Sequence, residues 1–395
     1  MNPRALFLAL ALAACGTGDI GSVPRTEEPA PEPEPEAFDI TTLDAAATHA
    51  YLSKIAPPLV GRVLSPAENA QIDAEGGAAI DPILRAWQTE PALVQAARVM
   101  MEEKLSVSGQ GADVDYALPG NLVEHVVASD LPWSEILTAT SCYDAEGAPI
   151  ECDSGAPFTA GVLTTRGFLK SRASRFNLTR SSTLMRAFAC QVYPQEETLQ
   201  PKVPLDQLKP MFAITDLSEA NAEDVAAAVN TGCACNDCHG QFAAHAQLFV
   251  KFDEEGLYRP EATGLQDPEG ELGRSTDGLM ASHFEVESVA ASEASQLFGT
   301  PVANLAEAGR ALAEHPIFLQ CAAQNVLEYT LRIDTAGPLG KAVSSDMLEA
   351  IAARAEEDHL DPTFPEIVHA VFTDADVVRT TLLTATIHGE SDEEP

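Results

Sequence analysis

Five consecutive residues, Cys235-Asn236-Asp237-Cys238-His239, constrain this chain more than any other feature of its sequence. In a Cys-x-x-Cys-His motif the two thiols can bond to the vinyl groups of a haem, and the histidine that follows can bind the iron. The motif occurs once, so it predicts a single covalently attached haem c, with Cys235, Cys238 and His239 holding it. A di-haem peroxidase would need a second motif.

Two other structures are compatible with the same residues. A zinc ion could bind Cys233, Cys235, Cys238 and His239, although structural zinc sites usually draw their ligands from two separated pairs. Cys235 and Cys238 could also form a plain disulfide. Haem is favoured because the chain carries an export signal, and c-type haem is attached outside the cytoplasm.

The export signal occupies residues 1–15. Arg4 precedes the apolar run Ala5–Ala14, which is too short for a transmembrane helix, and Leu12-Ala13-Ala14-Cys15 resembles the lipobox of bacterial lipoproteins. The resemblance implies that Cys15 is acylated and becomes the mature N-terminus; an ordinary cleaved signal is the alternative. Gly16, and not Asp, follows the cysteine, so no inner-membrane retention signal is evident. By analogy with bacterial lipoproteins, the resemblance implies an outer-membrane lipoprotein of the cell envelope, facing the periplasm or the cell surface.

The next residues, 16–38, are rich in Pro and Glu, which predicts a disordered, extended tether. Beyond them apolar residues recur at helical spacing and strand-like alternation is scarce. We therefore expect a mainly α fold, a multi-segment helical protein with long loops and a c-type haem-attachment segment. Its predicted parts are an N-terminal helical domain (39–140), a haem-bearing module (155–262) and a C-terminal helical module (300–388).

Local signals mark where individual helices begin. Ser65-Pro66-Ala67-Glu68 has the form of a capping box with proline at the first helical position, which opens a helix toward Trp87. Pro91 begins another that runs to about Lys104, and a third begins near Asp130. Further helices are predicted at 218–228, 303–314, 316–332, 344–357 and 374–386, and long loops at 106–116, 140–160, 193–210 and 253–278.

The chain has eight cysteines, more than an exported protein would keep as free thiols. Cys142 and Cys152 flank a short loop, so a local disulfide is their simplest pairing. Of Cys190, Cys233 and Cys321, two could pair, and the sequence leaves open which two.

The formal net charge of −37 limits the partners. Such a surface repels nucleic acid, and it would steer a basic protein toward the chain at low salt. Colloidal solubility or a high-salt habitat explains the charge equally well. We expect a redox partner protein, which the charge would attract if it is basic, and contact with the membrane through the N-terminal lipid.

A basic stretch interrupts this acidic sequence. Residues 154–195 contain no Asp or Glu, and they include six cationic residues: Arg166, Lys170, Arg172, Arg175, Arg180 and Arg186. Ion pairs with the rest of the protein are the simpler explanation. The alternative is that arginines bind the haem propionates, for which their bidentate geometry is suited.

Three stretches resemble the planctomycete-type cytochrome-c-like modules of unknown function, in which a CxxCH-ending module precedes a C-terminal partner module. They are Arg180–Ala187, which keeps two arginines of the family's run but lacks its Pro and Gly, Phe252–Arg259, which keeps the spacing Phe-Asp-x-x-Gly-x-x-Arg, and 312–332. The resemblance implies a haem-bearing envelope protein and no particular reaction. With the propionate hypothesis, it makes Arg180, Arg186 and Arg259 the predicted cofactor-binding side chains.

A haem electron carrier usually has a second axial ligand. Met280 is the first choice, as a metal ligand opposite His239; His283, Met211, Met185 and an open sixth position are the alternatives. The sequence contains none of the hydrolase, nucleotide-binding or HExxH motifs. We therefore expect a mono-haem electron carrier, not a catalyst. The alternative is a surface interaction or assembly subunit whose haem, if present, is structural.

Overall fold

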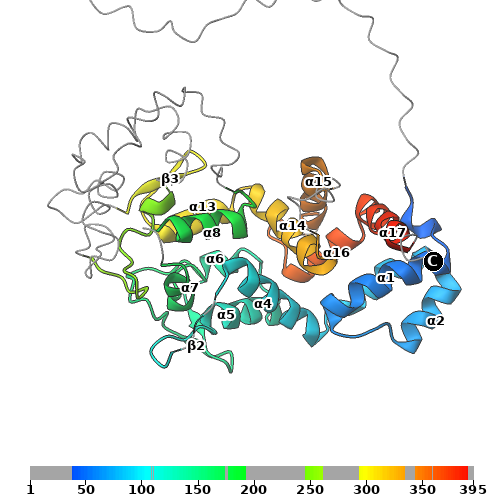
Figure 1. Cartoon of the computed structure of the whole chain (residues 1–395), viewed down its shortest axis with the longest axis horizontal. Helices are drawn as coiled ribbons and strands as arrows, with labels where there is room; N and C mark the ends of the chain where they lie inside the picture. The colour runs from blue at the N-terminus through cyan, green and yellow to red at the C-terminus, as the bar shows by residue number, and fades with distance from the viewer. Residues whose placement is uncertain are drawn as a thin grey trace, which may run out of the picture. The chain divides into compact units, whose positions relative to one another are not determined.

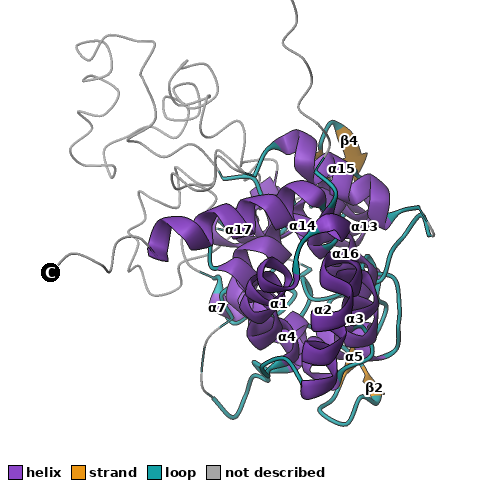
Figure 2. Cartoon of the chain, turned by 90° about the vertical axis from the view of Figure 1, so that its right-hand side faces the viewer, coloured by secondary structure: helices purple, strands orange, loops and turns teal. Residues whose placement is uncertain are grey.

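A computed structural model describes residues 38–389, with gaps at 108, 110, 174–176, 193–244, 261–292, 334–342 and 358. Within these residues the chain is mostly helical, with 13 α-helices and two short antiparallel hairpins. Figure 2 shows how little of the fold is strand. The mainly α prediction is confirmed for this part of the chain, whereas the haem-attachment segment lies outside it.

The helices, in chain order, are α1 (Ala45–Val60), α2 (Pro66–Glu75), α3 (Ile80–Trp87), α4 (Pro91–Leu105), α5 (Leu118–Ala128), α6 (Glu135–Thr138), α7 (Arg166–Ser171), α8 (Leu178–Phe188), α13 (Leu305–Ala313), α14 (Ile317–Leu331), α15 (Ser345–Ala355), α16 (Phe364–Phe372) and α17 (Ala375–Gly389). Two 3-10 turns, η1 (Ile40–Thr42) and η2 (Gly76–Ala79), accompany them. The strands are β1 (Cys142–Tyr143) paired with β2 (Pro149–Ile150), and β3 (Ser295–Leu297) paired with β4 (Thr300–Val302).

The predicted capping box at Ser65 is present. Its hydroxyl accepts a hydrogen bond from the Glu68 amide at 3.2 Å, and the Glu68 carboxylate accepts one from the Ser65 amide at 2.6 Å. The helix does not continue unbroken to Trp87, because the chain turns through η2. There a Cβ on Gly77 would lie 1.9 Å from the Ile40 carbonyl oxygen, so this close approach of η1 requires glycine.

Most of the predicted helices agree with the structure. Helices α4, α13, α14, α15 and α17 lie where they were expected, to within three residues at each end. The helix expected near Asp130 is only the short α6, and the predicted loop at 140–160 contains the β1–β2 hairpin. The helices α1, α5, α7, α8 and α16 were not individually predicted, and the helix predicted at 218–228 lies outside the described residues.

One hydrophobic core joins the three helical segments that the sequence distinguishes. Its buried side chains include Leu52 from α1, Leu184 from α8 and Phe318 from α14. Figure 1 shows α14 between α8 on one side and α15 and α16 on the other, and α14 also contacts α1 and α4. These contacts make α14 the central helix for the packing of the described residues.

Candidate functional site

The three residues of the haem motif, its neighbour Cys233, the expected axial ligand Met280 and the expected lipidation residue Cys15 lie outside the described residues. The structure does describe the residues on both sides of the stretch that carries the motif, residues 193–244, which is called the motif-bearing stretch below. The chain is described up to Val192 and again from His245. The candidate site is therefore defined by what holds these two edges in place.

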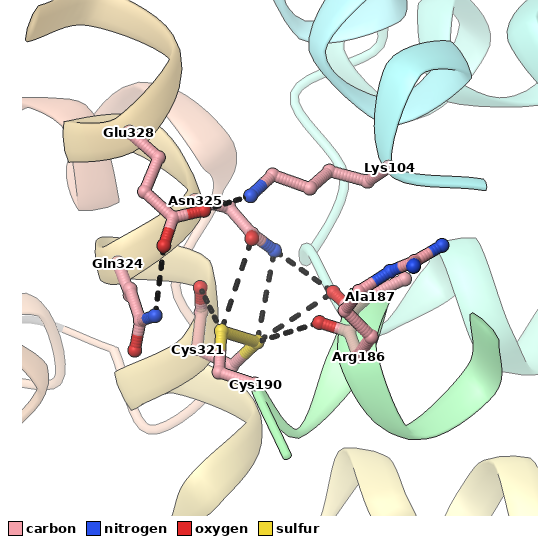
Figure 3. Close-up of a disulfide and its surroundings, with 8 residues drawn as sticks. All are labelled: Lys104, Arg186, Ala187, Cys190, Cys321, Gln324, Asn325 and Glu328. Atoms are coloured by element: carbon pink, nitrogen blue, oxygen red, sulfur yellow. Dashed lines mark hydrogen bonds and ion pairs between the residues drawn. A yellow bond between two sulfur atoms is a disulfide. The ribbon is translucent and has the colours of Figure 1, made fainter. Parts of the chain in front are cut away.

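The upstream edge is fixed by a disulfide. Cys190, two residues after α8, is bonded to Cys321 of α14, with 5.1 Å between their Cα atoms. Asn325, one turn further along α14, donates from its side-chain amide to the Ala187 carbonyl at 2.8 Å and so holds the end of α8. Figure 3 shows the sulfur pair and Asn325 side by side against the last turn of α8. This pairing resolves the choice among three cysteines that the sequence left open.

An ion pair stabilises the same junction. Lys104 of α4 donates to the carboxylate of Glu328 on α14, and Gln324 donates to the other oxygen of that carboxylate at 2.9 Å (Figure 3). Both partners of the ion pair are largely shielded from solvent, with side chains 19% exposed. Helices α4, α8 and α14 therefore meet at the point where the motif-bearing stretch begins.

The downstream edge is held by the other end of α8. Asn177, directly before the helix, donates to the Phe249 carbonyl at 3.1 Å. Arg180 donates to the carbonyls of Phe252, at 2.7 Å, and Asp253. Since Asn177 and Arg180 lie at the start of α8 and Cys190 follows its end, this one helix fixes both edges of the motif-bearing stretch.

Arg180 is fully buried, with 0% exposure. Besides the two carbonyls downstream of the motif, it donates to the Leu169 carbonyl at 2.9 Å and to the Asn177 side chain at 2.8 Å. Burial lowers its pKa to about 9, against the raising effect of the nearby Asp253 charge, so it remains protonated at neutral pH. These contacts give Arg180 a structural role. Its predicted contact with a cofactor stays a prediction.

The stretch Phe252–Arg259 is a tight turn built around one carboxylate. Asp253 accepts hydrogen bonds from the amides of Glu255 and Leu257, both at 2.9 Å, and from Nε of Arg259 at 2.7 Å. Gly256 has φ +73°, and a Cβ there would lie 2.9 Å from Leu169 Cβ. The spacing Phe-Asp-x-x-Gly-x-x-Arg thus has a local structural explanation, and Arg259, a predicted cofactor-binding residue, pairs here with Asp253.

Besides the buried Arg180, four cationic residues of the basic stretch are described, and they divide into two groups. Arg166 and Lys170 on α7 face acidic residues: Arg166 lies 4.0 Å from the Asp113 carboxylate, and Lys170 pairs with Asp113 and Glu255. Arg172 and Arg186 instead contact hydroxyls. Arg172 donates to Thr183 at 3.1 Å, and Arg186 lies 3.5 Å from the Ser106 hydroxyl. Arg175 lies outside the described residues.

Of the candidate axial ligands, Met185 is described, and His245 is the first residue described after the motif. Met185 is buried in the core on α8, with 1% exposure, which is the ordinary position of an apolar side chain. Burial lowers the pKa of His245, so this imidazole tends to be neutral. The other axial candidates, His283 and Met211, lie outside the described residues with Met280.

The second disulfide joins Cys142 to Cys152, the pair that the sequence favoured, with a sulfur–sulfur distance of 2.07 Å. It closes the β1–β2 hairpin, in which Cys142 faces Ile150. The sequence favoured this short-range pairing, left Cys190 with Cys321 as one of three possible pairings, and gave no signal for the role of Asn177.

The described ranges contain neither a metal-binding cluster nor a membrane-spanning helix. No group of three or more His, Cys, Asp or Glu side chains there could hold a metal ion. No helix there combines the length and the apolar character that crossing a membrane requires.

Comparisons with known proteins give no relative: no family model, no curated protein and no solved structure matches this chain.

Proposed function

We propose that this protein is a lipid-anchored, mono-haem, c-type cytochrome-like protein that transfers electrons at the cell envelope. The observation that carries the proposal is the single motif Cys235-Asn-Asp-Cys238-His239 in a chain with an N-terminal lipobox. When bound, the haem would supply one-electron chemistry. The two thiols would hold it covalently, and His239 would bind the iron.

The cysteine chemistry supports this assignment. The structure pairs Cys142 with Cys152 and Cys190 with Cys321, which accounts for four of the eight cysteines. These four are therefore unavailable to the motif as alternative disulfide partners. Of the remaining four, Cys15 belongs to the lipobox. Cys235 and Cys238 supply the two thiols that thioether attachment needs, and Cys233 has no role in this assignment.

The scaffold around α8 supports the assignment as well. An electron carrier benefits from a site that changes little between oxidation states, which a rigid surrounding framework provides. Asn177 and Arg180 at one end of α8 and the Cys190–Cys321 disulfide at the other supply such a framework. In this proposal Arg180 positions the chain downstream of His239, while Arg186 and Arg259 remain the side chains proposed to face the cofactor.

The proposed location is based on the N-terminal residues, and the proposed partner on the net charge. Acylation of Cys15 would anchor the protein, since two or more acyl chains are enough for stable attachment, and outer-membrane placement is the expected destination. The Pro/Glu-rich residues 16–38 would hold the body away from the lipid. The net charge of −37 would attract a basic redox partner at low ionic strength.

A pyridine haemochrome spectrum of the denatured protein, purified from a host with cytochrome maturation, tests the proposal. We expect one covalent haem per chain, and none in the variant Cys235→Ala plus Cys238→Ala. An intact mass without an added porphyrin in the wild-type protein would refute it. A reversible, low-spin haem would support electron transfer, whereas a five-coordinate, high-spin haem would count against it.

A second function, an interaction or assembly subunit at the surface, is favoured by the extent of the helical scaffold. Its core includes side chains such as Leu52 and Phe372, which are far in sequence from the motif. If the haem-less variant keeps its binding partners and loses only redox activity, the haem serves electron transfer and this second function is rejected.

A further inference from the structure

Two arginines on the α7–α8 side of the scaffold differ from most of the other described arginines. Outside the basic stretch, described arginines pair with carboxylates, with the exception of Arg310: they are Arg62, Arg85, Arg98, Arg259, Arg332, Arg354 and Arg379. Arg172 and Arg186 make no ion pair with a carboxylate within the described ranges. In a chain with 60 acidic residues and 23 Lys and Arg, a shortage of carboxylates does not explain this.

Both arginines are associated with one face of α8. Arg172, directly after α7, donates from Nε to the hydroxyl of Thr183 at 3.1 Å. Arg186 follows Thr183 by three residues on the same helix, so their side chains share a face. Figure 3 shows Arg186 extending from α8 away from the disulfide. Both arginines therefore lie along the last turns of α8, close to the edge at Cys190.

The contacts described for these two arginines use only part of their N–H donors. The contact with Thr183 uses Nε of Arg172, and the contact with Ser106 uses Nη2 of Arg186 at the long distance of 3.5 Å. Arg186 is exposed, and Arg172 is partly buried. Two guanidinium groups that keep Nη donors without a carboxylate partner in the described part of the chain match the two oxygens of a carboxylate.

Electrostatics point the same way. Burial lowers the pKa of Arg172, and the positive charge of Arg186 lowers it further. Two like charges on one face of α8, with no carboxylate paired to either among the described residues, are unfavourable for the folded state, and a bound anion would relieve the repulsion.

We propose that Arg172 and Arg186 form a carboxylate-binding site, and that in the haem-loaded protein its ligand is a haem propionate. The identity of that ligand rests on the proposed function, whereas the site itself rests on the two arginines. Arg172 thereby joins the side chains that act toward the cofactor, and Arg180 serves as a positioning residue.

The first test uses the haem-loaded full chain and measures the midpoint potential against pH. An ionised propionate beside two arginines has a lowered pKa, so Arg172→Gln and Arg186→Gln should each move the pH-dependent part of the profile up by about one unit. Arg310→Gln is the matched control, because Arg310 is also exposed and without a carboxylate partner in the described part of the chain. If both variants carry haem and their profiles coincide with the Arg310→Gln profile, the propionate assignment is wrong. The proposed function is not affected by that result.

The second test uses the haem-less variant Cys235→Ala plus Cys238→Ala and succinate as the probe. We expect succinate to raise its melting temperature, and to lose this effect when Arg172→Gln and Arg186→Gln are added. If the wild-type chain proves to carry no haem, the same result still supports a carboxylate site, with an external ligand. Absence of any arginine-dependent succinate effect in the folded haem-less protein overturns the site.

Discussion

The guanidinium of Arg180 donates to the main-chain carbonyl of Phe252 across 2.7 Å, although 72 residues separate the two in sequence. Arg180 lies near the start of α8, and Phe252 follows the stretch that carries Cys235-Asn-Asp-Cys238-His239. One buried side chain thus connects the helix before the motif to the chain after it. The stability of the folded protein should depend strongly on this contact.

We predict that Arg180→Ala lowers the free energy of unfolding by about 3 kcal/mol or more, because it leaves a cavity and several buried carbonyls without donors. Urea unfolding at neutral pH measures the change. Arg379→Ala is the control, since Arg379 is half exposed and, among the described residues, forms an ion pair with Asp376 alone; its effect should stay within about 0.5 kcal/mol. Equal effects of the two substitutions would show that the buried contacts of Arg180 contribute little.

The two disulfides should contribute unequally. Cys190 and Cys321 are 131 residues apart, and Cys142 and Cys152 are 10 apart. Because a disulfide stabilises mainly by restricting the unfolded chain, we expect the variant Cys190→Ser plus Cys321→Ser to lose about 5 kcal/mol and Cys142→Ser plus Cys152→Ser about 3 kcal/mol. Denaturant unfolding of both variants against the wild-type protein gives the comparison. A larger loss for the short loop would contradict this account.

Local chemistry explains which parts of the fold were predictable. The capping box at Ser65 gave the start of α2, and the same pattern at Thr363-Phe-Pro-Glu366 opens α16, so that helix could have been found from the sequence. Helix α1 was harder to detect because it contains Pro57 and Pro58, which ordinarily argue against a helix.

The site was less predictable because its contacts are non-local. The pairing of Cys190 with Cys321 depends on how α8 packs against α14, which no local pattern encodes. The sequence identified Arg166, Arg180 and Arg186 only as members of one basic group. The tertiary structure shows that Arg166 pairs with Asp113 and that Arg180 is buried against main-chain carbonyls. Arg186 has no carboxylate partner in the described ranges.

Glu68 should make stability depend on pH in the acidic range. Burial alone would raise its pKa, but hydrogen bonds from Arg62, Trp87 and Ser65 outweigh that effect and lower it to about 2. A carboxyl whose folded-state pKa is depressed stabilises the fold above its unfolded value near 4.5, and this stability is lost as the pH falls toward about 2. We therefore expect Glu68→Gln to cost at most about 3 kcal/mol at pH 7 and much less at pH 3.

Urea unfolding of the wild-type protein and Glu68→Gln at both pH values measures this difference. Glu349→Gln, which replaces an exposed carboxylate on α15, is the control and should change stability little at either pH. A Glu68→Gln deficit that is the same at pH 7 and pH 3 would mean that the charge of Glu68 does not contribute to stability.

The distal ligand gives the sharpest spectroscopic prediction. If Met280 binds the iron opposite His239, Met280→Ala should convert the low-spin haem to a high-spin form and lower the midpoint potential, since a methionine ligand raises it. Met185→Leu should leave the spectrum unchanged, because Met185 lies on α8 and is buried in the hydrophobic core, with 1% exposure. Absorption spectra and potentiometry of both variants decide the matter. A low-spin spectrum in Met280→Ala would assign the ligand elsewhere, with His283 and Met211 as the next positions to replace.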